Sequence, residues 1–131
     1  MQVFVVAKLF VENAKGELLV IRRSQTAPRR PLEWDLPGGW VELDEAPNEA
    51  AIRELCEETG IITKRITSLC TATEERDDET ITRHYFIAKT EHDQVVLSFE
   101  HDAFEWVSRD NFVDYMRYQP HLDAFEKLQY K

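Results

Sequence analysis

The chain has 131 residues, 43% of them hydrophobic and 31% charged, and its formal net charge is −9 at pH 7. This composition excludes a disordered chain, and the length suits one domain with its own core rather than two. The acidic balance argues against partners such as nucleic acid polymers or anionic membranes, because binding either needs basic surface. We therefore expect a single domain over residues 1–131.

The first strand candidate covers residues 2–11, which are rich in Val and Phe, as in a strand buried on both faces. Lys8 interrupts this apolar run, which is too short to span a bilayer and lacks the flanks of a signal peptide. We therefore expect a core strand in a cytoplasmic protein. Residues 13–17 predict a turn, and residues 18–23 predict the returning strand.

A polar loop follows at residues 24–34, and a glycine turn follows the loop. In residues 35–43 we expect Pro37, Gly38 and Gly39 to prevent regular structure. The backbone carbonyls of such a turn can approach a metal ion closely, because glycine adds no side chain.

Residues 46–59 predict a helix, with Asp44 as its N-cap and Gly60 as its C-terminal stop. The apolar side of this helix is expected to consist of Ala51, Ile52, Leu55 and Cys56. Cys56 and Cys70 make no CxxC pair, and we expect both to be buried, reduced thiols.

The second half of the chain contains further strand and helix candidates. The expected strands are residues 66–75, 80–90, 95–98 and 104–108, the first two forming a hairpin around an acidic turn. Short helices are expected over residues 109–118 and 120–131. Strands around one helix, with helices at the end, predict an α/β domain with a mixed sheet.

Three carboxylates, Glu54, Glu57 and Glu58, crowd one short stretch of the predicted helix. At about 100° per residue they share one face, where like charges repel. Such an oxygen-rich group suits a hard cation such as Mg²⁺ or Mn²⁺, and the alternative is a solvated helix face. We also expect Arg53 to reach back to Glu45, holding the loop to the helix and sparing the three acids for a metal.

Residues 39–61, GWVELDEAPNEAAIRELCEETGI, resemble the signature of the Nudix hydrolase family, G-x5-E-x7-R-E-U-x-E-E-x-G-U, where U is a bulky aliphatic residue. The residues at the specified positions all match: Gly39, Glu45, Arg53, Glu54, Leu55, Glu57, Glu58, Gly60 and Ile61. The flanks WDLPG and EHDAFEWV are also similar, so the likeness covers about residues 2–110. A match of this specificity favours the metal site over the solvated face.

The resemblance implies an α/β/α sandwich around a mixed sheet, in which a loop–helix–loop carries the metal site. It implies hydrolysis of a nucleoside diphosphate linked to another moiety, with Mg²⁺ or Mn²⁺ as the cofactor. By the same resemblance, the metal ligands are the carbonyl of Gly38 and the carboxylates of Glu54, Glu57 and Glu58. Glu54 or a nearby residue would be the general base. The residues given a structural role are Gly39, Glu45, Arg53 and Gly60.

Glu100 lies six residues before Trp106, and MutT-like members of the family often carry a metal-binding or basic Glu in such a loop. We therefore expect Glu100 to be a catalytic residue and metal ligand, with a plain loop carboxylate as the alternative. Whether Glu54 or Glu100 is the general base stays open. His101 is expected to be a loop histidine rather than a base, and Trp106 a core residue.

Substrate contacts are expected upstream of the signature. The resemblance suggests that Arg23, at the end of a strand, contacts phosphate, although a solvated arginine is the alternative. Arg29 and Arg30 lie in a loop that could cover the cleft, and they add local positive charge to an acidic protein. Trp34 is expected either to stack on a base or to pack beside the glycine turn.

The favoured function is that of a MutT-like, Mg²⁺-dependent pyrophosphohydrolase acting on a nucleoside triphosphate. The alternatives are a hydrolase of a nucleotide sugar, ADP-ribose or a dinucleoside polyphosphate, and a nucleotide-sensing domain without turnover. The proline typical of similar ADP-ribose enzymes is absent from residues 74–80, which weakens that option. The expected partner is a small-molecule nucleotide, and the sequence leaves a homodimer open.

Overall fold

The computed structural model describes residues 2–130. The strands in this part of the chain are β1 (Gln2–Glu12), β2 (Leu18–Arg23), β3 (Trp34–Asp35), β4 (Gly38–Trp40), β5 (Ile66–Arg76), β6 (Glu79–Lys89) and β7 (His101–Val107). The helices are α1 (Pro47–Thr59), the 3₁₀ turn η1 (Arg109–Asn111), α2 (Phe112–Tyr115) and α3 (Gln119–Leu128). Residues 1 and 131, at the ends of the expected domain and of the expected last helix, lie outside the described residues.

The sheet is mixed, as predicted. Its strand order is β3-β2-β1-β6-β5, with β4 paired to β1 and β7 paired to β2. β1 and β6 run parallel over their whole lengths, and the other pairs are antiparallel. β1 pairs with β2 only at Glu12–Leu18, and farther along the same edge Lys8 of β1 pairs with Gly38 of β4. β1 and β2 therefore separate, and the glycine turn lies where they part.

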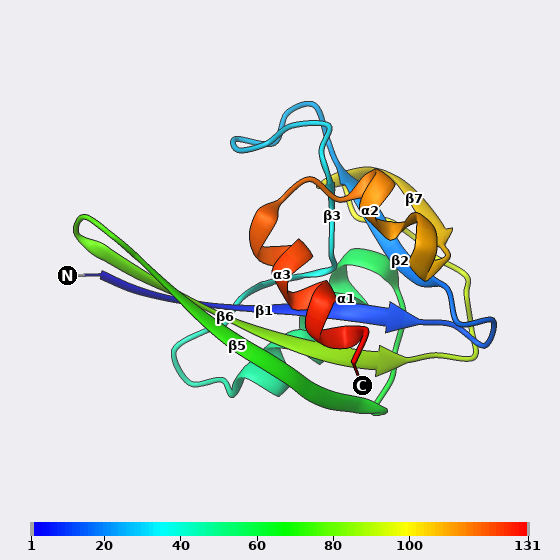
Figure 1. Cartoon of the computed structure of the whole chain (residues 1–131), viewed down its shortest axis with the longest axis horizontal. Coiled ribbons are helices and arrows are strands. Elements are labelled where there is room, and N and C mark those ends of the chain that lie inside the picture. The colour runs from blue at the N-terminus through cyan, green and yellow to red at the C-terminus, as the bar shows by residue number, and fades with distance from the viewer. Residues whose placement is uncertain (1, 131) are drawn as a thin grey trace.

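Helices cover both faces of the sheet, which gives the expected α/β/α sandwich (Figure 1). Alternate residues of β1 serve the two layers, because successive side chains of a strand point to opposite faces. Leu9 packs with Leu55 of α1 in one core cluster, whereas Phe10 packs with Phe112 and Phe125 of α2 and α3 in the other. The twisted β5–β6 hairpin extends beyond these layers (Figure 1).

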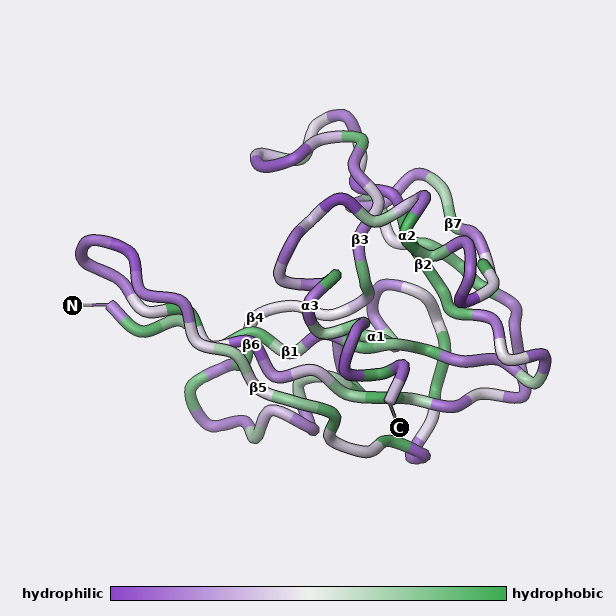
Figure 2. Tube along the Cα trace, viewed as in Figure 1, coloured by the Kyte–Doolittle hydropathy of each residue, from purple (hydrophilic) through white to green (hydrophobic). Residues whose placement is uncertain are grey.

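Hydropathy along the trace follows this architecture (Figure 2). The central parts of β1 and β2 are apolar, while the tip of the β5–β6 hairpin and the loop before β3 are hydrophilic. The predicted hairpin is confirmed, with Arg76 paired to Glu79 around the turn. No described helix combines the length and apolar character that crossing a bilayer would require.

Several local predictions were wrong. Residues 95–98 form no strand, and Gly38–Trp40 forms a short one despite its glycines. Gly38 has φ +134°, and a Cβ there would collide with the carbonyl oxygen of Ala7, so glycine allows β4 to lie against β1. Cys56 is exposed and Cys70 half-buried, because Cys56 lies on the solvent side of α1.

Candidate active site

α1 presents the carboxylates of the predicted site, and both of its ends are stabilised. Its N-cap is Ala46 rather than Asp44, and the side chain of Glu49 accepts a hydrogen bond from the Ala46 N–H at 2.8 Å. At the other end Gly60 adopts a left-handed conformation with φ 76°, and its N–H bonds the carbonyl of Cys56. The helix therefore ends at Thr59, directly after Glu57, which is exposed, and Glu58, which is buried.

Arg53 connects this helix to the preceding loop. Its Nε and Nη2 donate to the two carboxylate oxygens of Glu45 at 2.7 and 2.9 Å, so the predicted pair is present. The hydrogen bond from Arg53 lowers the pKa of Glu45 to about 2. The expectation that this pair spares the other acids was wrong, because Nη1 also bonds Glu54 at 2.9 Å and Glu57 at 3.0 Å.

Glu58 lies against the glycine turn. Its side chain is buried, and its Oε1 accepts the N–H of Gly38 at 2.8 Å. Burial raises the pKa of Glu58 to about 8, despite the opposing effects of Lys8 and of the Gly38 hydrogen bond. Gly39 lies over Glu54, and a Cβ on Gly39 would come within 2.7 Å of that carboxyl group. Two glycines therefore let the turn sit directly on two of the predicted metal ligands.

Glu54 and Glu100 lie within electrostatic reach of each other. Burial raises the pKa of Glu54, and the charges of Glu57 and Glu100 raise it further against the opposing effect of Arg53. Glu100 is exposed, and its backbone carbonyl accepts the N–H of Ser24 at 3.0 Å. The loop of Glu100 is therefore attached to the loop that follows β2, close enough for the Glu100 charge to act on Glu54.

The prediction that His101 lies in a loop was wrong, because His101 begins β7, and Trp106 lies farther along the same strand. His101 is buried, and its burial together with the charge of Lys8 lowers its pKa to about 4, so the ring is neutral at pH 7. Its Nδ1 has no hydrogen-bond partner among the described residues. Trp106 packs against the cluster on the α1 side, and its indole N–H donates to the carbonyl of Asp93 at 3.0 Å.

The predicted substrate-binding residues lie on and after β2. Arg23 donates to Asp35 at 3.1 Å and to the carbonyl of Arg29 at 2.8 Å, so its guanidinium is not a solvated strand end. Arg29 itself is exposed. Trp34 packs edge-on against Tyr115 of α2 with ring centroids 5.2 Å apart, rather than against the glycine turn.

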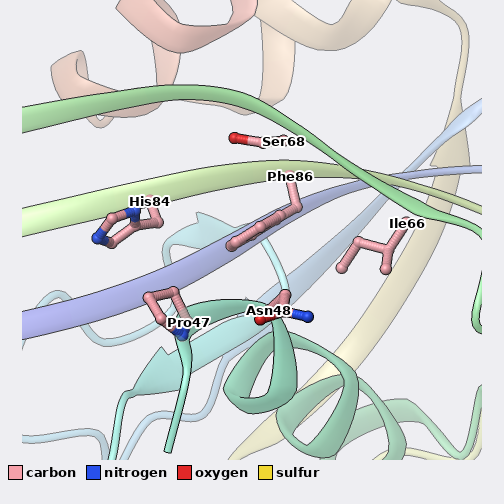
Figure 3. A pocket seen from close by; sticks show the side chains of 6 residues that line it. All are labelled: Pro47, Asn48, Ile66, Ser68, His84 and Phe86. Carbon is pink, nitrogen blue, oxygen red and sulfur yellow. The ribbon is translucent and has the colours of Figure 1, made fainter.

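A hollow of about 390 Å³ lies elsewhere, between the first turn of α1 and the β5–β6 hairpin (Figure 3). Its walls include Pro47 and Asn48 of α1 and the ring of Phe86. No predicted metal ligand lines it. We place the candidate site at the carboxylates instead, because the concentrated charge and the glycine turn occur there.

The comparison with protein families decides the identity of this arrangement. A model of the NUDIX domain matches residues 3–128. The chain belongs to the NUDIX domain family. In solved structures, the fold is similar to that of the MutT protein from Methanosarcina mazei Go1, with a TM-score of 0.86 and 30% sequence identity. That match covers 98% of this chain and 94% of the other.

Curated relatives match a shorter part of this Nudix chain. A MutT-like protein of Streptomyces ambofaciens is 47% identical over 51 residues, which are 39% of this chain and 30% of that protein. A putative 8-oxo-dGTP diphosphatase of Bacillus subtilis (strain 168) is 44% identical over 54 residues, 41% of this chain and 33% of that protein. The matched segments are therefore about a third of these relatives' lengths.

The donor atoms on and beside the Nudix helix are of the chemical type that a hard divalent cation prefers. They are carboxylate oxygens beside a glycine carbonyl, and burial raises the pKa of both Glu54 and Glu58 against the opposing charges of Arg53 and Lys8. Within residues 2–130, however, no three acidic, His or Cys side chains are already gathered for a metal. Arg53 holds Glu54 and Glu57, and Gly38 holds Glu58, so a cation would have to draw these carboxylates together.

Sequence reasoning missed a group of charged residues beneath the turn, which we call the Asp35 cluster: Lys8, Arg23, Arg30, Asp35 and His121. Asp35 is fully buried and lies 3.3 Å from Lys8, 3.1 Å from Arg23 and 3.7 Å from Arg30. Burial opposes its ionisation, but Lys8 and the hydrogen bond from His121 hold the pKa of Asp35 well below its usual range. The signals in the sequence were a lysine inside an apolar strand and an aspartate next to the glycine turn.

Proposed function

We propose that the chain is a Mg²⁺-dependent pyrophosphohydrolase that cleaves a nucleoside triphosphate or a related nucleoside diphosphate derivative, with Mn²⁺ as an alternative ion. The observation that carries this proposal is a complete Nudix signature whose Glu54 and Glu58 lie directly against Gly39 and Gly38. The similar proteins named MutT and 8-oxo-dGTP diphosphatase support a nucleoside triphosphate as the substrate class. Residues 2–130 are proposed to act as one domain, because both core clusters share one sheet.

The proposed metal ligands are the Gly38 carbonyl and four carboxylates: Glu54, Glu57, Glu58 and Glu100. A bound Mg²⁺ would offset the negative charge of both the protein and the polyphosphate and would polarise a phosphoryl oxygen. Glu45 keeps Arg53 on the loop side of the helix through two hydrogen bonds. That anchor allows the Arg53 contacts to Glu54 and Glu57 to be released without losing the loop.

The chain's own side chains supply the remaining steps. Glu54 of α1, or Glu100, whose charge acts on Glu54, is proposed to accept a proton from the attacking water. Arg23 and the exposed Arg29 are proposed to contact phosphate oxygens as charge develops on the leaving group. Trp34 packs against Tyr115 of α2, and its stacking on a base remains a prediction.

The test is a substrate panel assayed with Mg²⁺ and with Mn²⁺, containing nucleoside triphosphates, ADP-ribose, a nucleotide sugar and a dinucleoside polyphosphate. We expect release of pyrophosphate or phosphate from a triphosphate. Glu54→Gln or Glu58→Gln should lower kcat about a hundredfold or more, as for loss of a group that transfers protons or positions the reactants. Glu126→Gln, an exposed acid on α3, is the matched control and should leave kcat unchanged.

Each other outcome has a definite meaning. Turnover of ADP-ribose or a dinucleoside polyphosphate alone would move the chain to the alternative substrate class. Nucleotide binding without turnover would identify a sensing domain. Cleavage of nothing in the panel with either ion refutes the hydrolase, and full activity in both site variants refutes the residue roles.

A further inference from the structure

Lys8 points from the middle of β1 into the glycine turn. Its side chain is only 12% exposed, and its Nζ bonds the carbonyl of Leu36 at 3.0 Å and that of Gly38 at 3.4 Å. The same ammonium lies 3.3 Å from Asp35. Lys8 therefore bonds two carbonyl groups of the turn, one before Pro37 and one after Gly38.

Buried hydrogen bonds connect Asp35, the ion-pair partner of Lys8, to α3. Nε2 of His121, on α3, lies 2.8 Å from Oδ1 of Asp35, and the hydroxyl of Tyr85, on β6, lies 2.8 Å from Nδ1 of His121. Burial lowers the pKa of His121, so the ring is neutral, donates to ionised Asp35 and accepts from the Tyr85 hydroxyl. Asp35 also accepts the N–H of Leu36 at 2.8 Å. These contacts form one buried series of polar side chains, Tyr85–His121–Asp35–Lys8, which ends at the glycine turn.

The glycine turn also bonds a proposed metal ligand, Glu58. The N–H of Gly38 donates to buried Glu58, while the carbonyl of Gly38 accepts from Lys8. The two groups lie on either side of the Gly38 Cα, so a displacement of Gly38 would disturb both the Glu58 carboxylate and the proposed carbonyl ligand. Arg23 and Arg30 also neutralise Asp35, but their described hydrogen bonds go to Asp35, Glu33 and the Arg29 carbonyl rather than to the turn.

We propose that Lys8 is a positioning residue that, supported by the hydrogen-bonded series from Tyr85 through His121 and Asp35, holds Gly38 in place so that the Gly38 carbonyl and Glu58 face one cation. The inference rests on the proposed metal-dependent function and adds to it a residue outside the signature. Lys8 acts through Gly38 and Glu58 and needs no contact with substrate. Side chains that orient ligands in this way typically change metal affinity about 10–100-fold when removed.

The direct test measures Mn²⁺ affinity without substrate, by electron paramagnetic resonance of the free ion, in the wild type and in Lys8→Met. Methionine keeps much of the side-chain volume and removes both the donors and the charge. We expect the Kd for Mn²⁺ to rise about 10-fold or more. Lys8→Gln, which restores one donor for the Leu36 carbonyl, should give an intermediate Kd.

Arg109→Met is the matched control. Arg109 of η1 pairs at 2.7 Å with Glu12, which lies at the end of β1, the strand that also carries Lys8. This variant therefore loses an ion pair of β1 without removing a contact of the proposed ligands. Its Kd for Mn²⁺ should equal that of the wild type, even if its urea midpoint falls. The comparison separates loss of stability from loss of positioning.

Tyr85→Phe provides a second variant if Lys8→Met does not fold. It removes one hydroxyl at the far end of the buried series and should raise the Kd for Mn²⁺ less than Lys8→Met does. Variants with lower urea midpoints but the wild-type Kd would overturn the positioning role, and so would tighter Mn²⁺ binding in Lys8→Met, which would mean that the ammonium merely repels the cation. A wild type that binds no Mn²⁺ at all would refute the proposed function itself.

Discussion

The acidic face of α1 and the Asp35 cluster are neighbouring charged regions built in opposite ways. The carboxylates of α1 come from one short stretch of sequence, and Glu57 remains 56% exposed. The residues of the Asp35 cluster come from β1, β2, β3, α3 and the loop before β3, and Asp35 is fully buried. The acidic face carries excess negative charge, whereas the buried cluster surrounds one carboxylate with three cations.

This difference in charge and burial indicates different roles for the two regions. Arg53 relieves part of the repulsion between Glu54 and Glu57, and we propose that a cation relieves the rest, which makes this face the proposed reactive part. The Asp35 cluster is already compensated and satisfied, so it suits a rigid support. The glycine turn joins the two, since Gly38 bonds Glu58 on one side and Lys8 on the other.

The largest effect on stability is expected from Asp35→Asn. The change leaves Lys8, Arg23 and Arg30 around a neutral group, and breaking a buried ion pair costs about 3–5 kcal/mol of the free energy of unfolding. Urea titrations at pH 7 would measure the loss. A loss as small as that of an exposed ion pair would show that the cluster supports nothing.

The same variant predicts a pH dependence. The pKa of Asp35 is lowered in the folded state, so its contribution is present above the unfolded value of about 4 and is lost as the pH falls through the folded value. The difference in unfolding free energy between wild type and Asp35→Asn should therefore shrink as the pH is lowered below about 4. A difference that stays constant in acid would contradict the assigned charge state.

The acidic face should respond to pH in the opposite sense. Burial raises the folded pKa of Glu58 to about 8 from the usual 4.5 of a glutamate, so the folded protein binds more protons than the unfolded chain between these values. Without metal, the wild type should lose stability relative to Glu58→Gln as the pH rises through this window, by at most about 1.4 kcal/mol per pH unit. Urea titrations in a chelator, from pH 5 to pH 9, would check the sign.

A smaller effect is expected from Tyr85→Phe. The change leaves Nδ1 of buried His121 without its partner, which should lower the free energy of unfolding by about 1–3 kcal/mol. The loss should be smaller than that of Asp35→Asn, because no charge is left uncompensated. The same urea titration measures both variants. A larger loss of unfolding free energy in Tyr85→Phe than in Asp35→Asn would contradict the greater importance of the buried charge.

The smallest effect is expected at an exposed pair. Arg22 bonds Asp102 at 2.8 Å, but both side chains are more than a third exposed. Arg22→Ala should leave the urea midpoint unchanged, because exposed ion pairs are screened by solvent and salt. A loss comparable to that of Tyr85→Phe would mean that short distance, rather than burial, decides the strength of these pairs.

The elements with strong local patterns were predicted from sequence, including the hairpin of β5 and β6 and the span of α1. The predicted strand at residues 95–98 was wrong because its residues bond to the end of α1 rather than to a neighbouring strand. Ser98 N–H, for example, bonds the carbonyl of Glu58. Apolar composition alone could not reveal that choice of partner.

The sequence by itself determined the family signature, the acidic helix and the pair between Glu45 and Arg53, because their partners lie within one local stretch. Tertiary structure alone decided where Lys8 points and that Asp35 meets His121, which lies 86 residues later. Such contacts depend on which strands pair and which faces the helices cover, and local patterns do not specify either. The support beneath the glycine turn was therefore visible only in the folded chain.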